Sequence, residues 1–329
     1  MRFGFDVDGG WLSPNDHVDS AVLAEKLGYD SLWIGDHLMP WFDDAAQAPA
    51  AWPWLGVALA RTSRIKVGPA VTVPIGGRYH PVLVGQAAAT LDSMFPGRFV
   101  LGVGTGQAMS EQRFMESWPG WKERGERLEE GLKLIRKLWT EDRYFDWKGK
   151  FFPMEKMYLY TRPAGPIDVY VSARGRHAAR IAGQLGDHLM TPVSDTAKIR
   201  DEIIPEFERS VRLSGRDPSK AHKIGYMAVG IGDVDELVNL LRNSAGAAGL
   251  IDAARGEMDP RKIQEMSAQA PRDLLIKHHH LVRRAEELIE PAQALVDAGC
   301  DYLIFNDESR RTSSALRSIA EEVVPQVKE

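Results

Sequence analysis

A (β/α)8 barrel, a TIM-type α/β fold, is the fold class that this sequence predicts, and three observations lead to it. Short apolar segments typical of buried strands alternate with amphipathic segments typical of helices through most of the 329 residues. About eight such strand segments occur, most of them followed by a helix. No change of composition marks a second domain. An open doubly wound sheet is the alternative, but eight units favour the closed barrel, which typically takes about 250 residues before insertions.

The first half of the chain supplies four strand–helix units. The strand segments are residues 2–7, 31–36, 65–71 and 98–103. The helical segments are residues 17–27, 54–62, 82–95 and 121–139. In the last of these helices Leu128, Leu132, Ile135 and Leu138 share one face and charged residues occupy the other, as expected for a helix that packs on a core.

The second half continues the pattern after an interruption at residues 142–162, where 144–152 is expected to form a surface hairpin. The strand segments are residues 168–172, 188–191, 223–231 and 301–305. Helices are predicted from Arg176 onward and at 197–214, 286–298 and 313–327. The stretch of about 233–276 is helical but irregular. We interpret it as an insertion into one domain that spans residues 1–329.

Composition and charge narrow the function classes. The formal net charge of −5 gives no reason to expect a nucleic acid or an anionic membrane as a partner. The single cysteine, Cys300, excludes an internal disulfide and a cysteine metal cluster, which suits a reducing cytoplasm. The chain opens on a strand-like segment without a basic and apolar leader. No uncharged apolar run approaches the roughly 20 residues of a membrane helix. We therefore expect a cytoplasmic protein.

The segment that follows the second strand is the main candidate for chemistry. In a barrel the residues after every strand lie on one rim, and here they are Asp36, His37 and Trp41. A histidine moves protons near neutral pH, an adjacent carboxylate can orient it, and an indole can lie against a flat ring. A helix-capping aspartate beside a structural histidine is the alternative interpretation.

Other rim loops offer weaker signals. Trp11 follows the first strand, after two glycines, and either walls a pocket or covers the barrel mouth. Arg78 after the third strand either contacts an anionic ligand or is a plain rim residue. After the fourth strand, Gly102-Val-Gly-Thr-Gly-Gln-Ala-Met-Ser-Glu111 lets a ring or phosphate approach main-chain amides. This loop is neither a Walker loop nor a dinucleotide fingerprint in its usual place.

A phosphate site is predicted after the fifth strand. Ala173, Arg174, Gly175 and Arg176 lead into a helix, whose first amides attract anions. Arginine at a helix N-terminus is disfavoured by the helix dipole unless an anion compensates. We therefore prefer phosphate binding to two solvated arginines.

Metal and covalent hydrolase chemistry find little support. The run His278-His-His280 points its side chains in different directions, and no His-Glu-x-x-His motif accompanies it. A surface or substrate-pocket role is the better interpretation of this run, so no metal is expected. The chain has no Gly-x-Ser-x-Gly elbow, and Cys300 lacks the setting of a nucleophile.

The order of several motifs resembles the bacterial luciferase-like superfamily, and within it the oxidoreductases that depend on the deazaflavin coenzyme F420. The chain looks especially like the glucose-6-phosphate and secondary-alcohol dehydrogenase branch. The motifs are Ser31-Leu-Trp-Ile-Gly-Asp-His-Leu-Met-Pro-Trp41, Arg78-Tyr-His-Pro81, Phe95-Pro-Gly-Arg98, the glycine loop from Gly102 to Glu111, and Ala182-Gly-Gln-Leu-Gly-Asp-His188.

The resemblance implies a (β/α)8 barrel with a late insertion, commonly a homodimer, and it assigns roles to individual residues. His37 would face the deazaflavin ring and the reacting oxygen of the substrate, and Trp41 would position the substrate. The bond between Ala70 and Val71 matches the family's non-proline cis peptide, which bulges against the back of the ring. Asp36 is grouped with the coenzyme site, Thr105 and Gly106 would contact the ring or its side chain, and residues 173–176 would hold the phosphate.

Departures from the family pattern bear on which substrate the protein is expected to use. A glutamate follows Gly-Thr-Gly in these dehydrogenases, whereas Gln107 stands here and cannot exchange a proton. Gly10 replaces another glutamate, and a phosphate-binding arginine of the family falls at His278. These differences argue against glucose 6-phosphate. Trp11, Glu111 and His278 are our candidates for the substrate pocket.

The predicted function is hydride transfer between coenzyme F420 and a small organic substrate, which is an alcohol or carbonyl, or a C=C or C=N compound. His37 is the acid/base, and Trp41 and Gln107 lie beside it. Two alternatives stay open. One is an FMN-dependent luciferase-like monooxygenase, and the other is a barrel that binds the coenzyme without catalysis.

Overall fold

Eight parallel strands form a nearly closed barrel in the computed structural model, which describes residues 1–7, 10–246 and 256–328. Their order is β3-β2-β1-β11-β9-β8-β7-β4, and isolated bridges between Val67 and Phe99 and between Thr72 and Val103 link the two end strands. The predicted fold class is therefore confirmed. The barrel strands are β1 (Arg2–Asp6), β2 (Ser31–Ile34), β3 (Lys66–Pro69), β4 (Leu101–Val103), β7 (Val169–Ser172), β8 (His188–Thr191), β9 (Lys223–Ile231) and β11 (Tyr302–Asp307).

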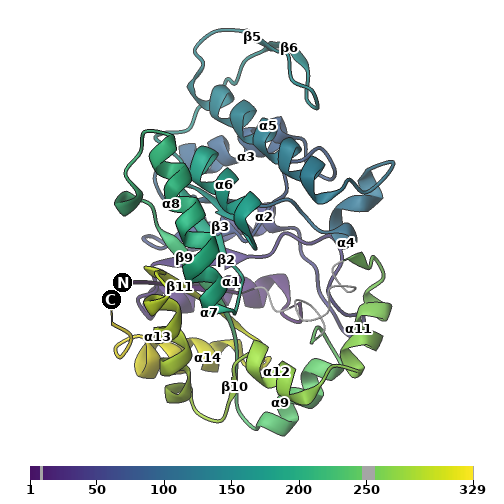
Figure 1. Ribbon diagram of the computed structural model, residues 1–329, viewed down its shortest axis with the longest axis vertical. Helices are drawn as coiled ribbons and strands as arrows, with labels where there is room; N and C mark the ends of the chain where they lie inside the picture. Colours follow the sequence, from purple (N-terminus) through teal and green to yellow (C-terminus); the bar gives the residue numbers. More distant parts are fainter. Residues whose placement is uncertain (8–9, 247–255, 329) are drawn as a thin grey trace.

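Helices surround this barrel, as Figure 1 shows. In chain order they are α1 (Pro14–Lys26), α2 (Ala51–Arg61), α3 (Pro81–Met94), α4 (Ala108–Glu111), α5 (Trp121–Thr140), α6 (Arg176–Leu185), α7 (Thr196–Lys198), α8 (Ile204–Leu213), α9 (Val234–Arg242), α11 (Pro260–Ala268), α12 (Arg272–His278), α13 (Ile289–Asp297) and α14 (Thr312–Ser318). The predicted helix over 197–214 is divided by a π-helical turn at Ile199–Ile203. Pro205, in the first turn of α8, lacks the amide hydrogen that would continue the regular bonding.

Two additions extend the barrel. The hairpin of β5 (Phe145–Trp147) and β6 (Met154–Met157) projects at the top of Figure 1, beyond α5. Helices α9, α11 and α12 lie together at the opposite end, with β10 (Leu281–Val282) pairing β9. Residues 8–9 of the first rim loop and 247–255 of the predicted insertion lie outside the described residues. Across the described ranges, we find no helix with the length and hydropathy needed to cross a bilayer.

The interior of the barrel has its own apolar cluster, separate from the larger core between strands and helices. Its fully buried members include Trp33, Tyr170, Ile224 and Ile304. The Trp33 indole donates to Ser31 Oγ at 2.6 Å and meets the edge of Tyr170 at 5.2 Å between ring centroids. This cluster fills the barrel below its carboxyl-terminal rim, so a ligand can enter only above it.

Candidate active site

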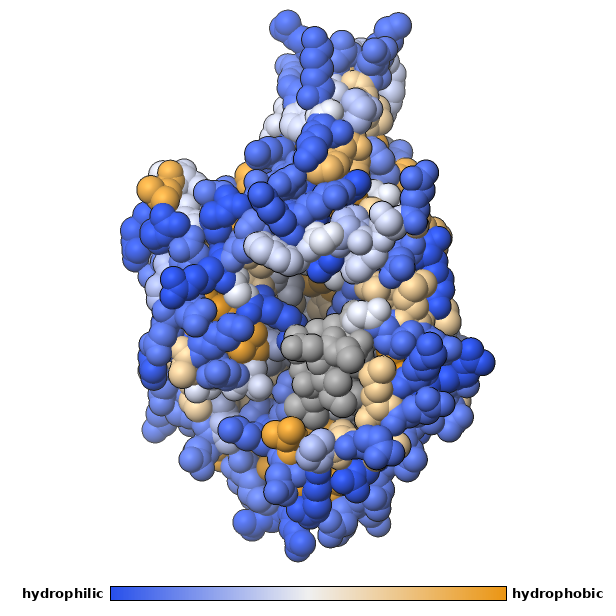
Figure 2. Space-filling view, turned by 45° about the vertical axis from the view of Figure 1, so that its right-hand side comes forward, coloured by the Kyte–Doolittle hydropathy of each residue, from blue (hydrophilic) through white to orange (hydrophobic). Residues whose placement is uncertain are grey.

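A pocket opens at the carboxyl-terminal rim of the barrel strands, where the sequence predicts the chemistry. Its empty volume is about 1250 Å³, part of it open to solvent. Figure 2 shows a hollow in an otherwise largely hydrophilic face, bordered in part by apolar residues. The described lining residues are Asp6, Gly10, Gly35, His37, Pro40, Trp41, Phe42, Gln47, Ala48, Pro49, Ala70, Gln107, Arg174, Pro192, Ser194, Tyr226, Ala228, Ala245, His278, His279, His280, Asn306 and Glu308.

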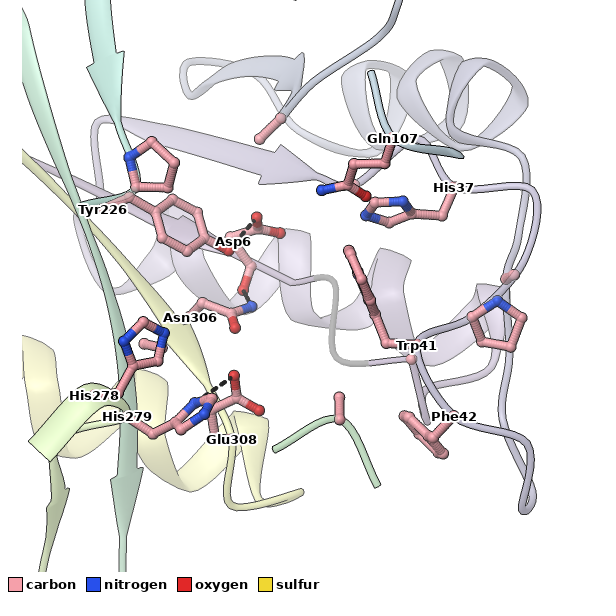
Figure 3. A pocket seen from close by; sticks show the side chains of 18 of the residues that line it. Asp6, His37, Trp41, Phe42, Gln107, Tyr226, His278, His279, Asn306 and Glu308 are labelled. Atoms are coloured by element: carbon pink, nitrogen blue, oxygen red, sulfur yellow. Dashed lines mark hydrogen bonds and ion pairs between the residues drawn. The ribbon is translucent and has the colours of Figure 1, made fainter. Parts of the chain in front are cut away.

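All three residues predicted for catalysis meet in this pocket. His37 and Trp41 come from the loop after β2, and their rings make an edge contact at 5.6 Å between centroids. Gln107, from the loop after β4, lies against His37 in Figure 3. Its Oε1 is buried and has no hydrogen-bond partner among the described residues. In Figure 3 this oxygen lies beside the His37 ring, and the amide nitrogen points into the pocket.

The Asp36 side chain binds three residues of the loop that follows β3, namely Thr72, Arg78 and Tyr79. Its carboxylate is 2% exposed and accepts from Thr72 Oγ1 at 2.7 Å, while Arg78 Nη2 lies 2.7 Å from its Oδ1. Tyr79 Oη donates to the same carboxylate at 3.3 Å, and burial raises the pKa of that phenol. Arg78 also donates to the Asp36 carbonyl oxygen, so it is a largely buried counter-charge that holds the backbone directly before His37.

Glu111 lies behind the pocket and does not line it. Its carboxyl group is fully buried and its Oε2 accepts from the Arg78 amide at 3.1 Å. Arg78 Nε is 3.8 Å from Oε1, which is too long for a hydrogen bond. Burial, with a smaller effect of Asp36, raises the pKa of Glu111 to about 7 against the opposing effect of Arg78. The structure thus separates Glu111 from the predicted substrate pocket.

The predicted coenzyme residues lie around the pocket at different depths. The Ala70–Val71 bond is cis, and Ala70 lines the pocket while Val71 lies beside the interior cluster. Thr105 and Gly106 lie next to Gln107 and are not lining residues. Gly106 has a φ of +77°, and a Cβ there would approach Val73 Cγ1 to 2.8 Å. Glycine is therefore required at this turn.

The start of α6 has the properties of an anion site. Gly175 precedes the helix without a side-chain cap, and a Cβ placed on it would meet nothing within 4 Å. Arg174 lines the pocket, and Ala173 is buried beneath it. Arg176 points elsewhere, since its Nε lies 3.7 Å from Glu202 Oε2 and its side chain is 67% exposed. The first amides of α6 and Arg174 therefore fit a phosphate.

A ring coenzyme with a phosphate fits this set of residues. The Gln107 amide nitrogen points into the pocket, Ala70 presents a cis peptide to the pocket, and Gly175 leaves space at a helix N-terminus. By contrast, the described residues hold no group of three or more His, Cys, Asp or Glu side chains placed for a metal ion.

The sequence did not reveal one side of the pocket. Asp6, Tyr226, Asn306, His279 and Glu308 line it across from His37 and Gln107 (Figure 3). Of the predicted substrate residues, His278 lines the pocket, 3.4 Å from Ser194 Oγ, whereas Trp11 lies outside it near Arg310. The sequence did contain a signal for three of these residues. Side chains along a strand point alternately into and out of the barrel, and this alternation in β1, β9 and β11 places Asp6, Tyr226 and Asn306 inside.

Comparison with known proteins gives consistent results. The family described as "Luciferase-like monooxygenase" matches residues 3–301. An F420-dependent glucose-6-phosphate dehydrogenase of Nakamurella multipartita is 33% identical, over 100% of this chain and 97% of the relative. The enzyme of the same name from Microbacterium testaceum is 32% identical, over 100% of this chain and 98% of the relative.

Among solved structures, an F420-dependent secondary alcohol dehydrogenase in complex with an F420-acetone adduct superposes with a TM-score of 0.93. It is 32% identical and the match covers 100% of this chain and 99% of that chain.

Proposed function

Because this chain belongs to the luciferase-like monooxygenase family, we propose that it is an F420-dependent oxidoreductase that transfers a hydride between coenzyme F420 and a small organic substrate. The predicted family relationship is thus confirmed, and the relatives named above support coenzyme F420 as the cofactor. The observation that carries the proposed chemistry is the convergence of His37, Trp41 and Gln107 in one pocket beside Ala70.

His37 is the proposed acid/base. When an alcohol is oxidised, its C–H bond breaks as a hydride leaves for the bound coenzyme, and His37 accepts the hydroxyl proton. In the reverse direction His37 returns that proton to the oxygen. The indole of Trp41 orients the substrate against the imidazole at the 5.6 Å ring contact. Gln107 donates or accepts hydrogen bonds without exchanging a proton.

Arg174 and the first amides of α6 are the proposed site for the coenzyme's phosphate. Coenzyme F420 supplies hydride-carrying chemistry when bound, and the protein supplies orientation and proton management. The arrangement of Asp36, Thr72 and Arg78 keeps the loops on both sides of the ring site in place.

We also propose that glucose 6-phosphate is not the substrate, although the relatives carry that name. Three departures from the sugar-phosphate enzymes, Gly10, Gln107 and His278, all line the pocket. Each one changes a group in direct reach of the substrate. A kinetic comparison of glucose 6-phosphate with other alcohols tests this statement.

A second candidate, an FMN-dependent monooxygenase, is favoured by the description of the family itself. Titration of the purified protein with FMN and with coenzyme F420 separates the two. We expect tight binding of F420 and weak binding of FMN. Tight FMN binding with oxygen consumption in the presence of a reductase contradicts our proposal.

On the basis of the family resemblance, we also propose that the protein is a homodimer and that it is cytoplasmic. Sedimentation velocity should then give a particle of twice 36.6 kDa. A monomer at micromolar concentration contradicts the dimer and leaves the chemistry unaffected.

A further inference from the structure

The apolar interior of the barrel changes to polar side chains directly beneath the pocket. Ile224 in β9 and Ile304 in β11 belong to the interior apolar cluster. Two residues further along each strand, and at the end of β1, the inward positions hold Tyr226, Asn306 and Asp6. A barrel needs no polar groups at this depth for packing, so these side chains point to a ligand.

Hydrogen bonds hold this layer in a fixed geometry. Tyr226 Oη donates to Asp6 Oδ2 at 2.8 Å, and Asn306 Nδ2 donates to the Asp6 carbonyl oxygen at 3.3 Å. Asp6 is 2% exposed and Asn306 is 6% exposed. Both residues nevertheless line the pocket, as Tyr226 does.

A second polar pair lies beside this layer. His279 Nδ1 is 3.3 Å from Glu308 Oε1, and His279 Nε2 is 3.4 Å from the Gly246 carbonyl oxygen. The two side chains are 4% and 14% exposed, respectively. Burial lowers the pKa of the neighbouring His280 to about 4, so His280 adds no positive charge at neutral pH. We call Asp6, Tyr226, Asn306, His279 and Glu308 the polar wall.

The charges of the pocket disfavour an anionic substrate. Its described lining holds two carboxylates, Asp6 and Glu308, and no lysine, and Arg174 is the single arginine. Arg174 lies at the α6 phosphate site proposed above. A phosphate group placed against the polar wall would meet the buried Asp6 and the largely buried Glu308, whose carboxylates repel it. By contrast, hydroxyl groups both donate and accept, and the polar wall offers both kinds of partner.

We propose that the polar wall binds the hydroxyl groups of a neutral polyol or unphosphorylated sugar. This inference rests on the proposed function, since the same His37 accepts the proton. The C–H bond at the reacting carbon breaks, its hydride passes to oxidised coenzyme F420, and the hydroxyl proton passes to His37. The product is a carbonyl compound, or a lactone when the reacting carbon is that of a sugar hemiacetal. Trp41 faces the C–H surfaces of the substrate.

The experiment compares four substrates with the F420-loaded enzyme: D-glucose, sorbitol, glucose 6-phosphate and 2-propanol. We expect kcat/KM for glucose or sorbitol to exceed that for the other two by about tenfold or more, the effect of one hydrogen bond to a charged group. A higher kcat/KM for glucose 6-phosphate or for 2-propanol overturns the inference.

Two variants test whether the polar wall causes the preference for polyols. Asp6→Asn and Glu308→Gln should each raise KM for the preferred polyol about tenfold and lower the ratio of polyol to 2-propanol turnover. Asp273→Asn, whose side chain is 96% exposed, is the matched control and should change neither value. Thermal unfolding and F420 binding verify that each variant is folded. An unchanged ratio in both folded variants overturns the inference.

The experiments distinguish failure of the polyol inference from failure of the proposed F420-dependent function. An enzyme that binds F420 and oxidises 2-propanol without preferring a polyol overturns the inference alone. A protein that binds no F420 and transfers no hydride overturns both. Calorimetric titration of glucose and of glucose 6-phosphate into the F420-loaded protein gives a readout independent of turnover, and stronger binding of the phosphate ester also contradicts the polar wall.

Discussion

At the scale of single residues, Glu111 is a carboxyl group near the site whose burial strongly changes its pKa. It is fully buried, it contacts the Arg78 amide, and its pKa is raised to about 7 chiefly by burial. The protonated form is therefore favoured in the folded protein up to near-neutral pH. Unfolding returns the carboxyl group to water, where its pKa is about 4.5.

This difference predicts a pH-dependent stability. Since the folded state holds the proton more tightly, the contribution of Glu111 is complete below about pH 4.5 and is lost as the pH rises to about 7. The loss is on the order of 2–3 kcal/mol. Urea unfolding of the wild type and of Glu111→Gln at several pH values measures it. We expect a shallower pH dependence for the variant, and identical pH profiles contradict the assignment.

At the scale of elements, α11 holds the loop that carries Trp41. Gln264 Oε1 accepts from the amides of Asp43 and Asp44 at 2.9 and 3.3 Å, and its Nε2 donates to Asp44 Oδ2 at 2.8 Å. Ile263 and Met266 of the same helix pack with Trp41 in one apolar cluster. The late helical segment therefore positions a residue of the proposed active site.

Removing the hydrogen bonds between Gln264 and the Trp41 loop should affect substrate binding more than the stability of the fold. In Gln264→Ala we expect KM to rise severalfold, because the Trp41 loop loses three hydrogen bonds worth about 1 kcal/mol each at most. Steady-state kinetics gives KM and kcat separately. Glu265→Ala, an exposed neighbour on α11, is the matched control. Equal KM values in the two variants argue against a positioning role for Gln264.

The start of α6 supports a comparison of two arginines. Arg174 lines the pocket, whereas Arg176 lies near Glu202. Arg174→Ala should weaken binding of coenzyme F420 about tenfold, the effect of a charge-assisted contact with phosphate. Arg176→Ala should weaken it less. Fluorescence titration with the coenzyme measures both, and a larger effect at Arg176 reverses the assignment.

At the scale of the whole molecule, the interior apolar cluster contributes to the stability of the barrel beside the larger core between strands and helices. Trp33 is fully buried among strands from both halves of the chain. We expect Trp33→Ala to lower the free energy of unfolding by about 3–5 kcal/mol, since it leaves a large cavity. Chemical denaturation measures this loss. Leu213→Ala, at a position 68% exposed, should stay within about 0.5 kcal/mol of the wild type, and similar losses in both variants contradict this account.

The sequence predicted the barrel because strand and helix periodicity persists along the chain, and every predicted barrel strand has a counterpart in the structure. It also predicted His37, Trp41 and Gln107 for one site, because they follow β2 and β4 on the same rim and because the family resemblance groups them. Of the polar wall it indicated only His279, as part of the histidine run at 278–280. Asp6 lies in β1, Tyr226 lies in β9 and Glu308 follows β11, and the pairing of β11 with both β1 and β9 brings these distant segments together. The role of Arg78 as partner of Asp36 likewise depends on tertiary packing.

The central claim is hydride transfer with His37 as the acid/base, and one measurement tests it most directly. Single-turnover reduction of bound coenzyme F420 is followed with the preferred alcohol for the wild type and for His37→Ala. We predict rapid reduction by the wild type and a rate lower by about 10²–10⁴-fold in the variant, with F420 binding retained. An unchanged rate in the variant, or no reduction by the F420-loaded wild type with any alcohol or polyol, contradicts the account.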